Sequence, residues 1–215
     1  MTLDAEKRLA AEAAAELVED AMVVGLGTGS TVAYLLPALA RRDLRLRCVA
    51  TSPATESAAR ELGLAVESFS GLEAPARLDV AIDGADQVAP DAWLVKGRGA
   101  AHTREKAVAA AADRFVVVVD SSKLVERVSS PVPLELSEFG LAATLARLGT
   151  VSLRDAARSP DGGVIADFTG SFDDVRELAD RLSAEPGVVE HGLFPPELVS
   201  DVIVAVGDRV EIRRR

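Results

Sequence analysis

The sequence is poor in the residues that form disulfide frameworks, metal sites and aromatic cores. It contains one cysteine, Cys48, and only two histidines, His102 and His191, in 215 residues. A single cysteine excludes an internal disulfide and fits a reducing compartment. So few thiol and imidazole groups offer no convincing metal site. Aromatic residues make up only 4% of the chain although 48% of it is hydrophobic, so the core must be aliphatic.

Long apolar runs and clustered positive charge are also missing. No hydrophobic stretch approaches the roughly 20 residues of a membrane span, and the N-terminal segment MTLDAEKRLA has no apolar signal region. The net charge of −10 opposes binding to nucleic acid, which depends on many clustered basic side chains. We therefore expect a cytoplasmic protein that binds neither membranes nor nucleic acid.

Lysine is scarce even among the basic residues. Only four of the 24 basic residues are lysines, namely Lys7, Lys96, Lys106 and Lys123, and the others are arginines. One interpretation is that lysine is kept where a compact point charge is required. The other interpretation is chance, and four residues leave both open.

Apolar runs alternate with helical segments over the first 129 residues. Residues 4–19 predict a helix with Asp4 as N-cap and Lys7 in its first turn. Strands are predicted at residues 21–24, 46–51, 64–66, 78–82 and 115–120. This alternation predicts an α/β fold, an open, mostly parallel sheet with helices on both faces.

The order of predicted helices and strands changes at Ser129-Ser130-Pro131. The order strand, helix, strand, helix, strand over residues 130–199, with a further strand around VSLRDA, predicts a small α+β domain. The chain then returns with DVIVAV and RVEIRR. We therefore predict a larger α/β catalytic domain of residues 1–129 and 200–215 and a smaller domain of residues 130–199.

A glycine-rich loop, Gly25 to Thr31, joins the first predicted strand to a helix. Backbone amides at a helix start, together with threonine and serine hydroxyls, suit a phosphate group. Ser30 stands where a dinucleotide fingerprint requires glycine, and the next strand ends in Thr51 and Ser52 instead of an acidic residue. The loop favours a monophosphate over a dinucleotide cofactor, with a purely structural turn as the alternative.

The segment from Asp83 to Lys106 gathers ionisable groups at the ends of short elements. Asp83 and Asp86 follow a buried strand, Lys96 ends a second apolar run, and Glu105 lies in the first turn of a predicted helix. Such groups at strand ends are typical of an active site in an open α/β sheet. For either aspartate alone, a solvated turn residue is an equally good interpretation.

Six motifs together resemble the type A family of ribose-5-phosphate isomerases over nearly the whole chain. They are VGLGTGST (24–31), IDGAD (82–86), KGRGAA (96–101), TREK (103–106), the SSK ending at Lys123, and GVVEHGLF (187–194). The resemblance implies an open α/β sheet with a smaller α+β lid domain. It also implies interconversion of ribose 5-phosphate and ribulose 5-phosphate in the pentose phosphate pathway, without metal or other cofactor, by a dimer or tetramer.

The resemblance also implies roles for single residues. Glu105 is similar to the general base of the family, and Asp83, Asp86 and Lys96 to the groups around the sugar hydroxyls and carbonyl, with Asp83 expected to assist ring opening. The expected substrate-binding residues are Thr28, Gly29, Ser30, Thr31, Gly84, Ala85, Gly97, Arg98 and Gly99, with Lys7 and Lys123 as nearby cations.

Three residues depart from the family pattern. Gln87 replaces a glutamate and is expected to be peripheral, Arg98 lies where the family has a small or uncharged residue, and His102 replaces an apolar residue. The Arg98 side chain either faces the substrate or points outward as a solvated charge, and we favour the outward orientation. A sugar-phosphate-sensing regulatory domain and an enzyme for another sugar phosphate are the alternative functions.

Overall fold

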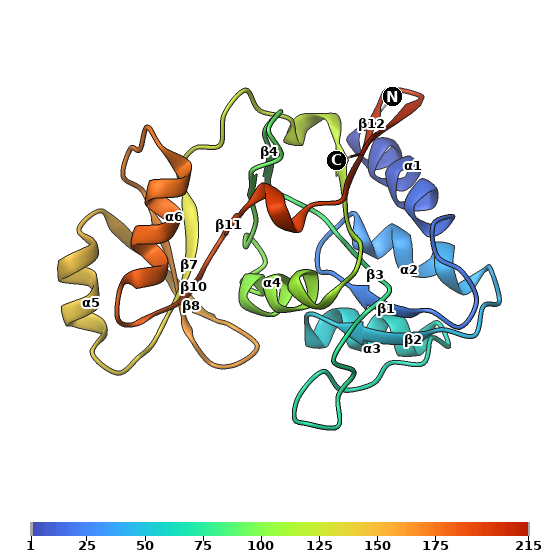
Figure 1. The fold of residues 1–215 in the computed structure, drawn as a ribbon, viewed down its shortest axis with the longest axis horizontal. Helices are drawn as coiled ribbons and strands as arrows, with labels where there is room; N and C mark the ends of the chain where they lie inside the picture. The colour runs from blue at the N-terminus through green and yellow to red at the C-terminus, as the bar shows by residue number, and fades with distance from the viewer. Residues whose placement is uncertain (1, 215) are drawn as a thin grey trace. The chain divides into compact units, whose positions relative to one another are not determined.

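A computed structural model describes residues 2–214 of the chain, and for residues 156 and 157 it describes the backbone only (Figure 1). Met1 and Arg215, the outer limits of the predicted catalytic domain, lie outside the described residues. The chain divides into two compact units. The first unit contains Met1–Ala85, Arg104–Leu124 and Glu197–Arg215, and the second contains Asp86–Thr103 and Val125–Pro196.

The first unit is built on a six-stranded sheet in the order β13-β12-β6-β3-β1-β2. All neighbouring strands are parallel except β13, which pairs antiparallel with β12 at one edge. The strands are β1 (Val23–Leu26), β2 (Arg47–Ala50), β3 (Val80–Asp83), β6 (Phe115–Asp120), β12 (Asp201–Val206) and β13 (Arg209–Arg214). The valine-rich β6 lies in the middle of the sheet and is buried along its full length, as a central parallel strand requires.

Helices cover both faces of this sheet. Val24 and Leu26 of β1 pack into a core with α1 (Leu3–Ala15), α2 (Val32–Ala40) and α3 (Pro53–Glu61). The intervening Gly25 faces the opposite side, where a side chain on it would collide with Val108 of α4 (His102–Ala111). In Figure 1, α1 lies beside β12, with which it also packs.

Helix caps decide where two of these helices begin. Ser52 caps α3, as its sequence predicts, because its hydroxyl accepts a hydrogen bond from the Thr55 amide at 3.2 Å. The predicted N-cap Asp4 is wrong, because α1 begins at Leu3 and Thr2 caps it by accepting a hydrogen bond from the Ala5 amide. Asp4 instead pairs with the Lys7 ammonium at 3.1 Å.

The second unit contains two antiparallel sheets and two helices. The four-stranded sheet has the order β10-β7-β9-β8, and the three-stranded sheet has the order β11-β5-β4. The strands are β4 (Gln87–Val88), β5 (Leu94–Val95), β7 (Val132–Leu136), β8 (Val151–Arg158), β9 (Val164–Phe168), β10 (Val188–His191) and β11 (Leu193–Phe194). The helices α5 (Leu141–Leu148) and α6 (Val175–Ala184) follow β7 and β9 in the chain. The fold class predicted from the sequence is confirmed in both parts.

Short elements differ from the sequence-based expectations in two places. The predicted strand 64–66 is reduced to one bridge between Val66 and Cys48. The run VVEHGLF forms two strands in different sheets, β10 and β11, on either side of Gly192, where a side chain would overlap the Lys96 carbonyl. No described helix is long and apolar enough to cross a membrane.

The limits of the compact units differ from the predicted domain boundaries, which were placed from the change of element rhythm alone. Residues 86–103 belong to the second unit because β4 and β5 form a sheet with β11. Trp93 and Val95 from this segment are buried in the core of the second unit.

Candidate active site

The glycine-rich loop is held against the end of β3 in the first unit. A side chain at Gly27 would overlap the Asp83 carboxylate, so only glycine fits at this position. The Asp83 carboxylate accepts hydrogen bonds from the amides of Thr28, at 3.0 Å, and Gly84, at 2.7 Å. Asp83 is buried, and its two hydrogen bonds fix the loop backbone at the carboxyl edge of the parallel sheet.

A chain of hydroxyl groups supports the same loop from below. Thr28 Oγ1 lies 2.7 Å from Thr51 Oγ1, and Thr55 donates to the Gly27 carbonyl at 2.9 Å. Ser52 also bonds to Thr55 at 3.0 Å. Thr51 and Thr55 were not predicted as site residues, although a strand that ends in Thr-Ser was a visible signal. These hydroxyls position Thr28.

The loop that precedes α2 is exposed at two residues. Gly29 and Ser30 are exposed, and Gly29 has a φ of +128°, a backbone conformation that favours glycine. Thr31 caps α2 without a side-chain hydrogen bond, and the first turn of α2 contains no acidic residue. Amides at a helix N-terminus attract anions, so this part of the loop is suited to a phosphate group.

Glu6 links the elements that present Lys7 and Lys123. Its carboxylate accepts hydrogen bonds from Ser121, through the hydroxyl at 2.7 Å and the amide at 3.0 Å, and from the Gly207 amide at 2.8 Å. The Ser121 and Gly207 hydrogen bonds lower the pKa of Glu6, with the Ser121 hydroxyl as the largest cause. Lys7 follows Glu6 in α1, and Lys123 ends the 3₁₀ helix η1 (Ser121–Lys123).

Glu105 projects from the first turn of α4 and is only 4% exposed. The positive end of a helix dipole favours a negative charge in the first turn. A buried carboxylate of this kind can accept a proton from carbon and return it. Ala85 and Gly84, which follow β3 in the same unit, are half-buried.

Asp86 and the Gly97–Gly99 turn come together in the second unit. The Asp86 carboxylate accepts a hydrogen bond from the Arg98 amide at 3.0 Å. The Arg98 side chain is 77% exposed, and its Nε lies 3.4 Å from the Asp86 carboxylate. Gly97 has a φ of +111°, and a side chain on it would collide with His102 and Pro133. The turn therefore has a defined shape.

Lys96 and His102 are buried on either side of this turn. Lys96 is 2% exposed, its amide donates to the Gly192 carbonyl at 2.8 Å, and its ammonium lies 5.4 Å from the centre of the Phe194 ring. The His102 ring is fully buried, with Nε2 3.4 Å from the Glu190 carbonyl oxygen, and fills the space that Gly97 leaves. His102 thus packs under the turn, as the apolar residue expected at this position would.

Gln87 fastens β4 to the segment that precedes β7. Its side-chain amide donates to the Ser129 carbonyl at 3.0 Å, and its oxygen accepts from the Ser129 amide at 2.8 Å. A glutamate could accept the second bond but could not donate the first. Gln87, which departs from the family pattern, therefore helps to hold the second unit together.

The predicted site residues divide between the units by their place in the chain. The first unit contains Lys7, Thr28, Gly29, Ser30, Thr31, Asp83, Gly84, Ala85, Glu105 and Lys123, and the second contains Asp86, Lys96, Gly97, Arg98 and Gly99. The structure brings Thr28 to Asp83 and Arg98 to Asp86. It also shows Arg154 on the Gly97–Gly99 turn, a contact between residues 57 positions apart that the sequence gives no sign of.

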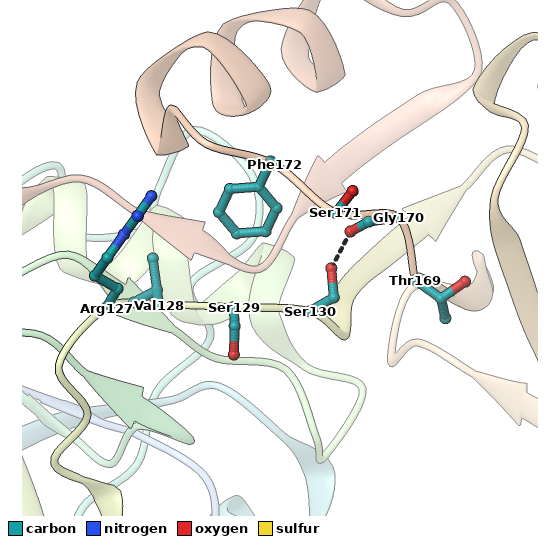
Figure 2. Close-up of a pocket in the computed structure, with 8 residues that line it drawn as sticks. All are labelled: Arg127, Val128, Ser129, Ser130, Thr169, Gly170, Ser171 and Phe172. Atoms are coloured by element: carbon teal, nitrogen blue, oxygen red, sulfur yellow. Dashed lines mark hydrogen bonds between the residues drawn. The ribbon is translucent and has the colours of Figure 1, made fainter.

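A separate pocket in the second unit contains none of the predicted site residues. Figure 2 shows it between residues 127–130 and 169–172, with Ser130 donating to the Gly170 carbonyl across one end. Its volume is about 410 Å³.

Within residues 2–214, no three His, Cys, Asp or Glu side chains gather as metal ligands would. Burial raises the pKa of the Cys48 thiol to about 12.

Comparison with known proteins matches the motifs and the fold described above. The family model of ribose 5-phosphate isomerase A (phosphoriboisomerase A) matches residues 47–209. A ribose-5-phosphate isomerase A from Halobacterium salinarum is 48% identical, over 97% of this chain and 95% of its own length.

Solved structures similar to this chain are also ribose 5-phosphate isomerases. The crystal structure of ribose 5 phosphate isomerase A from Neisseria gonorrhoeae has a TM-score of 0.93 and 31% identity, over 99% of this chain and 97% of its own. A D-ribose-5-phosphate isomerase in complex with phospho-erythronic acid has a TM-score of 0.92 and 33% identity, over 100% of both chains. The resemblance is thereby confirmed, and the chain belongs to the ribose 5-phosphate isomerase A family of isomerases.

Proposed function

We propose that this isomerase interconverts D-ribose 5-phosphate and D-ribulose 5-phosphate, with Glu105 as the general base. The observation that carries the proposal is a buried carboxylate in the first turn of α4, in a chain whose glycine-rich loop also presents exposed amides for a phosphate. A structural relative with a TM-score of 0.92 binds phospho-erythronic acid, a phosphorylated sugar acid, which supports a sugar phosphate as substrate.

The chemistry requires a base, a cation and a phosphate anchor. Aldose–ketose exchange moves a proton between adjacent carbons through an enediolate, and one carboxylate can serve first as base and then as acid. Glu105 takes this role, and Lys96 stabilises the charge that develops on the carbonyl oxygen. Triosephosphate isomerase shows related chemistry with a glutamate base.

The remaining groups bind and open the sugar. Asp83 assists the proton transfer that opens the furanose ring, and Asp86 holds sugar hydroxyls. The amides of Gly29 and Ser30 bind the phosphate together with the Thr28 and Thr31 hydroxyls, and Lys7 and Lys123 supply positive charge. The loop carbons of Gly84 and Ala85 and the turn Gly97–Gly99 line the substrate.

The direct test mixes the purified protein with ribose 5-phosphate and EDTA and measures ketose. Formation of ribulose 5-phosphate in EDTA supports the proposal, and no ketose from folded protein rejects it. A panel of pentose and hexose phosphates then identifies the preferred substrate. A higher kcat/KM for another sugar phosphate shows that the substrate is wrong, and binding without turnover favours a sensing domain.

The setting of the reaction is also a proposal. We place the enzyme in the cytoplasm, in the non-oxidative branch of the pentose phosphate pathway, as a homodimer or homotetramer. The family supports the pathway. Light scattering of the purified protein measures the mass of the assembly, and a monomer at working concentration rejects the oligomer.

A further inference from the structure

Arg154 connects β8 to the Gly97–Gly99 turn within the second unit. Its Nη1 donates to two successive backbone carbonyls of the turn, those of Gly97 and Arg98, each at 3.0 Å. Its other two nitrogens donate to the two oxygens of Asp167, each at 2.7 Å. One guanidinium thus binds a carboxylate on one side and a turn on the other.

The local backbone explains why Arg154 reaches so far. β8 is an edge strand, and its regular pairing with β9 ends at Leu153. A register shift follows, and such irregularities re-aim side chains away from the pleat. Asp167 on β9 then fixes the direction of the guanidinium, because a bidentate pair allows little rotation. The hydrogen bonds with Asp167 also raise the pKa of Arg154, so it stays charged.

The turn needs such support because its backbone is unusual. Gly97 has a φ of +111° and Ala100 a φ of +61°, and positive values are costly for a residue with a side chain. The Ala100 amide donates to the Gly97 carbonyl at 3.0 Å, and Asp86 accepts from the Arg98 amide. Arg154 adds a charged donor to the Gly97 carbonyl, which the Ala100 amide also contacts, and to the Arg98 carbonyl.

We propose that Arg154 is a positioning residue that holds the Gly97–Gly99 turn in the shape that receives the substrate. The inference rests on the proposed function, in which this turn lines the sugar phosphate. Arg154 acts through the turn backbone, and Asp167 acts through Arg154. Without the guanidinium, two carbonyls lose a charged donor and the turn relaxes.

The first experiment measures the turn itself, without substrate. Hydrogen exchange of peptides that contain the Arg98 and Ala100 amides is compared between the parent and Arg154→Met. We expect these amides to exchange at least about tenfold faster in the variant, because local opening becomes easier. The matched control is Arg158→Met, which removes a second β8 arginine that pairs with Glu138 at 3.1 Å and contacts the Gly162 carbonyl. The control should leave exchange at the turn unchanged.

The second experiment measures the consequence for catalysis. Arg154→Met is expected to raise KM for ribose 5-phosphate about tenfold, with kcat changed less than about threefold, because the turn binds substrate and transition state alike. Arg154→Lys should not restore KM, since a single ammonium cannot hold a carboxylate and two carbonyls in one plane. A merely structural positive charge would be restored by lysine.

The outcomes separate the inference from the proposed function. A folded Arg154→Met protein with parental exchange at the turn overturns the positioning role. Faster exchange with an unchanged KM also overturns it, because the shape of the turn then has no effect on the substrate. A parent protein that does not convert ribose 5-phosphate rejects the proposed function, and hydrogen exchange alone then decides whether Arg154 shapes the turn.

Discussion

Glu105 is the side chain on which the proposed chemistry depends, because the proton must leave one carbon and return to its neighbour through a single base. Glu105→Gln keeps the size of this buried side chain and removes its basicity. We expect kcat to fall by about 10²-fold or more, measured by ketose formation. The matched control is Glu177→Gln, an exposed glutamate in the first turn of α6. Near-normal turnover of a folded Glu105→Gln variant would remove this residue from the mechanism.

Lys96 and Lys123 test whether the scarce lysines are kept for their compact charge. Lys96 is almost fully buried against Phe194, so the larger guanidinium of Lys96→Arg cannot take its place without displacing neighbours. We expect turnover to fall about tenfold or more, a loss of ~1.4 kcal/mol. Lys123→Arg should mainly raise KM. If steady-state kinetics of both variants match the parent, the lysine bias is chance.

Arg98 is the charge that the family pattern does not supply. Its side chain is mostly exposed and pairs loosely with Asp86, and exposed pairs contribute only about 0–1 kcal/mol. We therefore expect Arg98→Met to keep KM within about twofold and to leave the acidic limb of the pH profile in place. Kinetics across pH and salt measure both. A tenfold rise in KM would mean that the guanidinium reaches the phosphate.

At the scale of elements, Glu6 joins α1 to η1 and to the hairpin between β12 and β13. Its folded-state pKa is lowered from 4.5 by the Ser121 hydroxyl and the Ser121 and Gly207 amides. A lowered folded-state pKa gives stability that is present above the unfolded value and lost as pH falls through the folded value. Glu6→Gln should therefore be less stable than the parent at neutral pH, with a difference that shrinks in acid.

Urea unfolding at neutral pH and at a pH below 4.5 measures this difference. Glu12→Gln is the control, because Glu12 lies in the same helix and pairs with exposed Arg41 at 3.4 Å. A stability difference for Glu6→Gln that stays constant or grows as the pH falls would show that the carboxylate charge is not the cause.

The elements that could be predicted from the sequence are those whose causes are local. Ser52-Pro53 marks the start of α3, and the valine run of β6 marks a buried strand, since caps and apolar runs act within a few residues. Thr2 was missed because threonine and aspartate are both good caps, and the sequence contains one of each at the start of α1. The break at Gly192 was missed because the residues that Gly192 contacts, Lys96 and Pro133, lie far away in the chain.

The site follows the same rule. Residues in contiguous motifs, such as Asp83 or Glu105, could be named from the sequence, and the structure places Asp83 on the glycine-rich loop. Thr55 contacts the glycine-rich loop, and Arg154 contacts the Gly97–Gly99 turn, each through a residue far away in the chain. No spacing in a single sequence indicates such contacts, because they depend on the register of strands that pair only in the folded chain.

At the scale of the whole molecule, neither compact unit is a continuous piece of chain. The second unit takes Ala89, Trp93 and Val95 into its core from residues 86–103. A fragment of residues 130–199, the smaller domain predicted from the sequence, lacks these side chains. It also lacks β4 and β5, two of the three strands in the sheet with β11. We expect this fragment to show no cooperative urea transition by circular dichroism.

The control fragment spans residues 86–196 with residues 104–124 replaced by a flexible Gly/Ser linker, which keeps every segment of the second unit. It should unfold cooperatively. Cooperative unfolding of the 130–199 fragment would instead show that residues 86–103 are not needed for the unit to fold.

The edge strand β13 has a consequence for solubility. Arg209, Arg213 and Arg214 lie on this exposed strand, with Val210 and Ile212 between them. An edge strand that carries apolar side chains can recruit another strand and start aggregation, and charged residues along it oppose that pairing. The arginines on β13 therefore oppose the addition of a further strand at this edge of the aliphatic sheet, and so oppose aggregation.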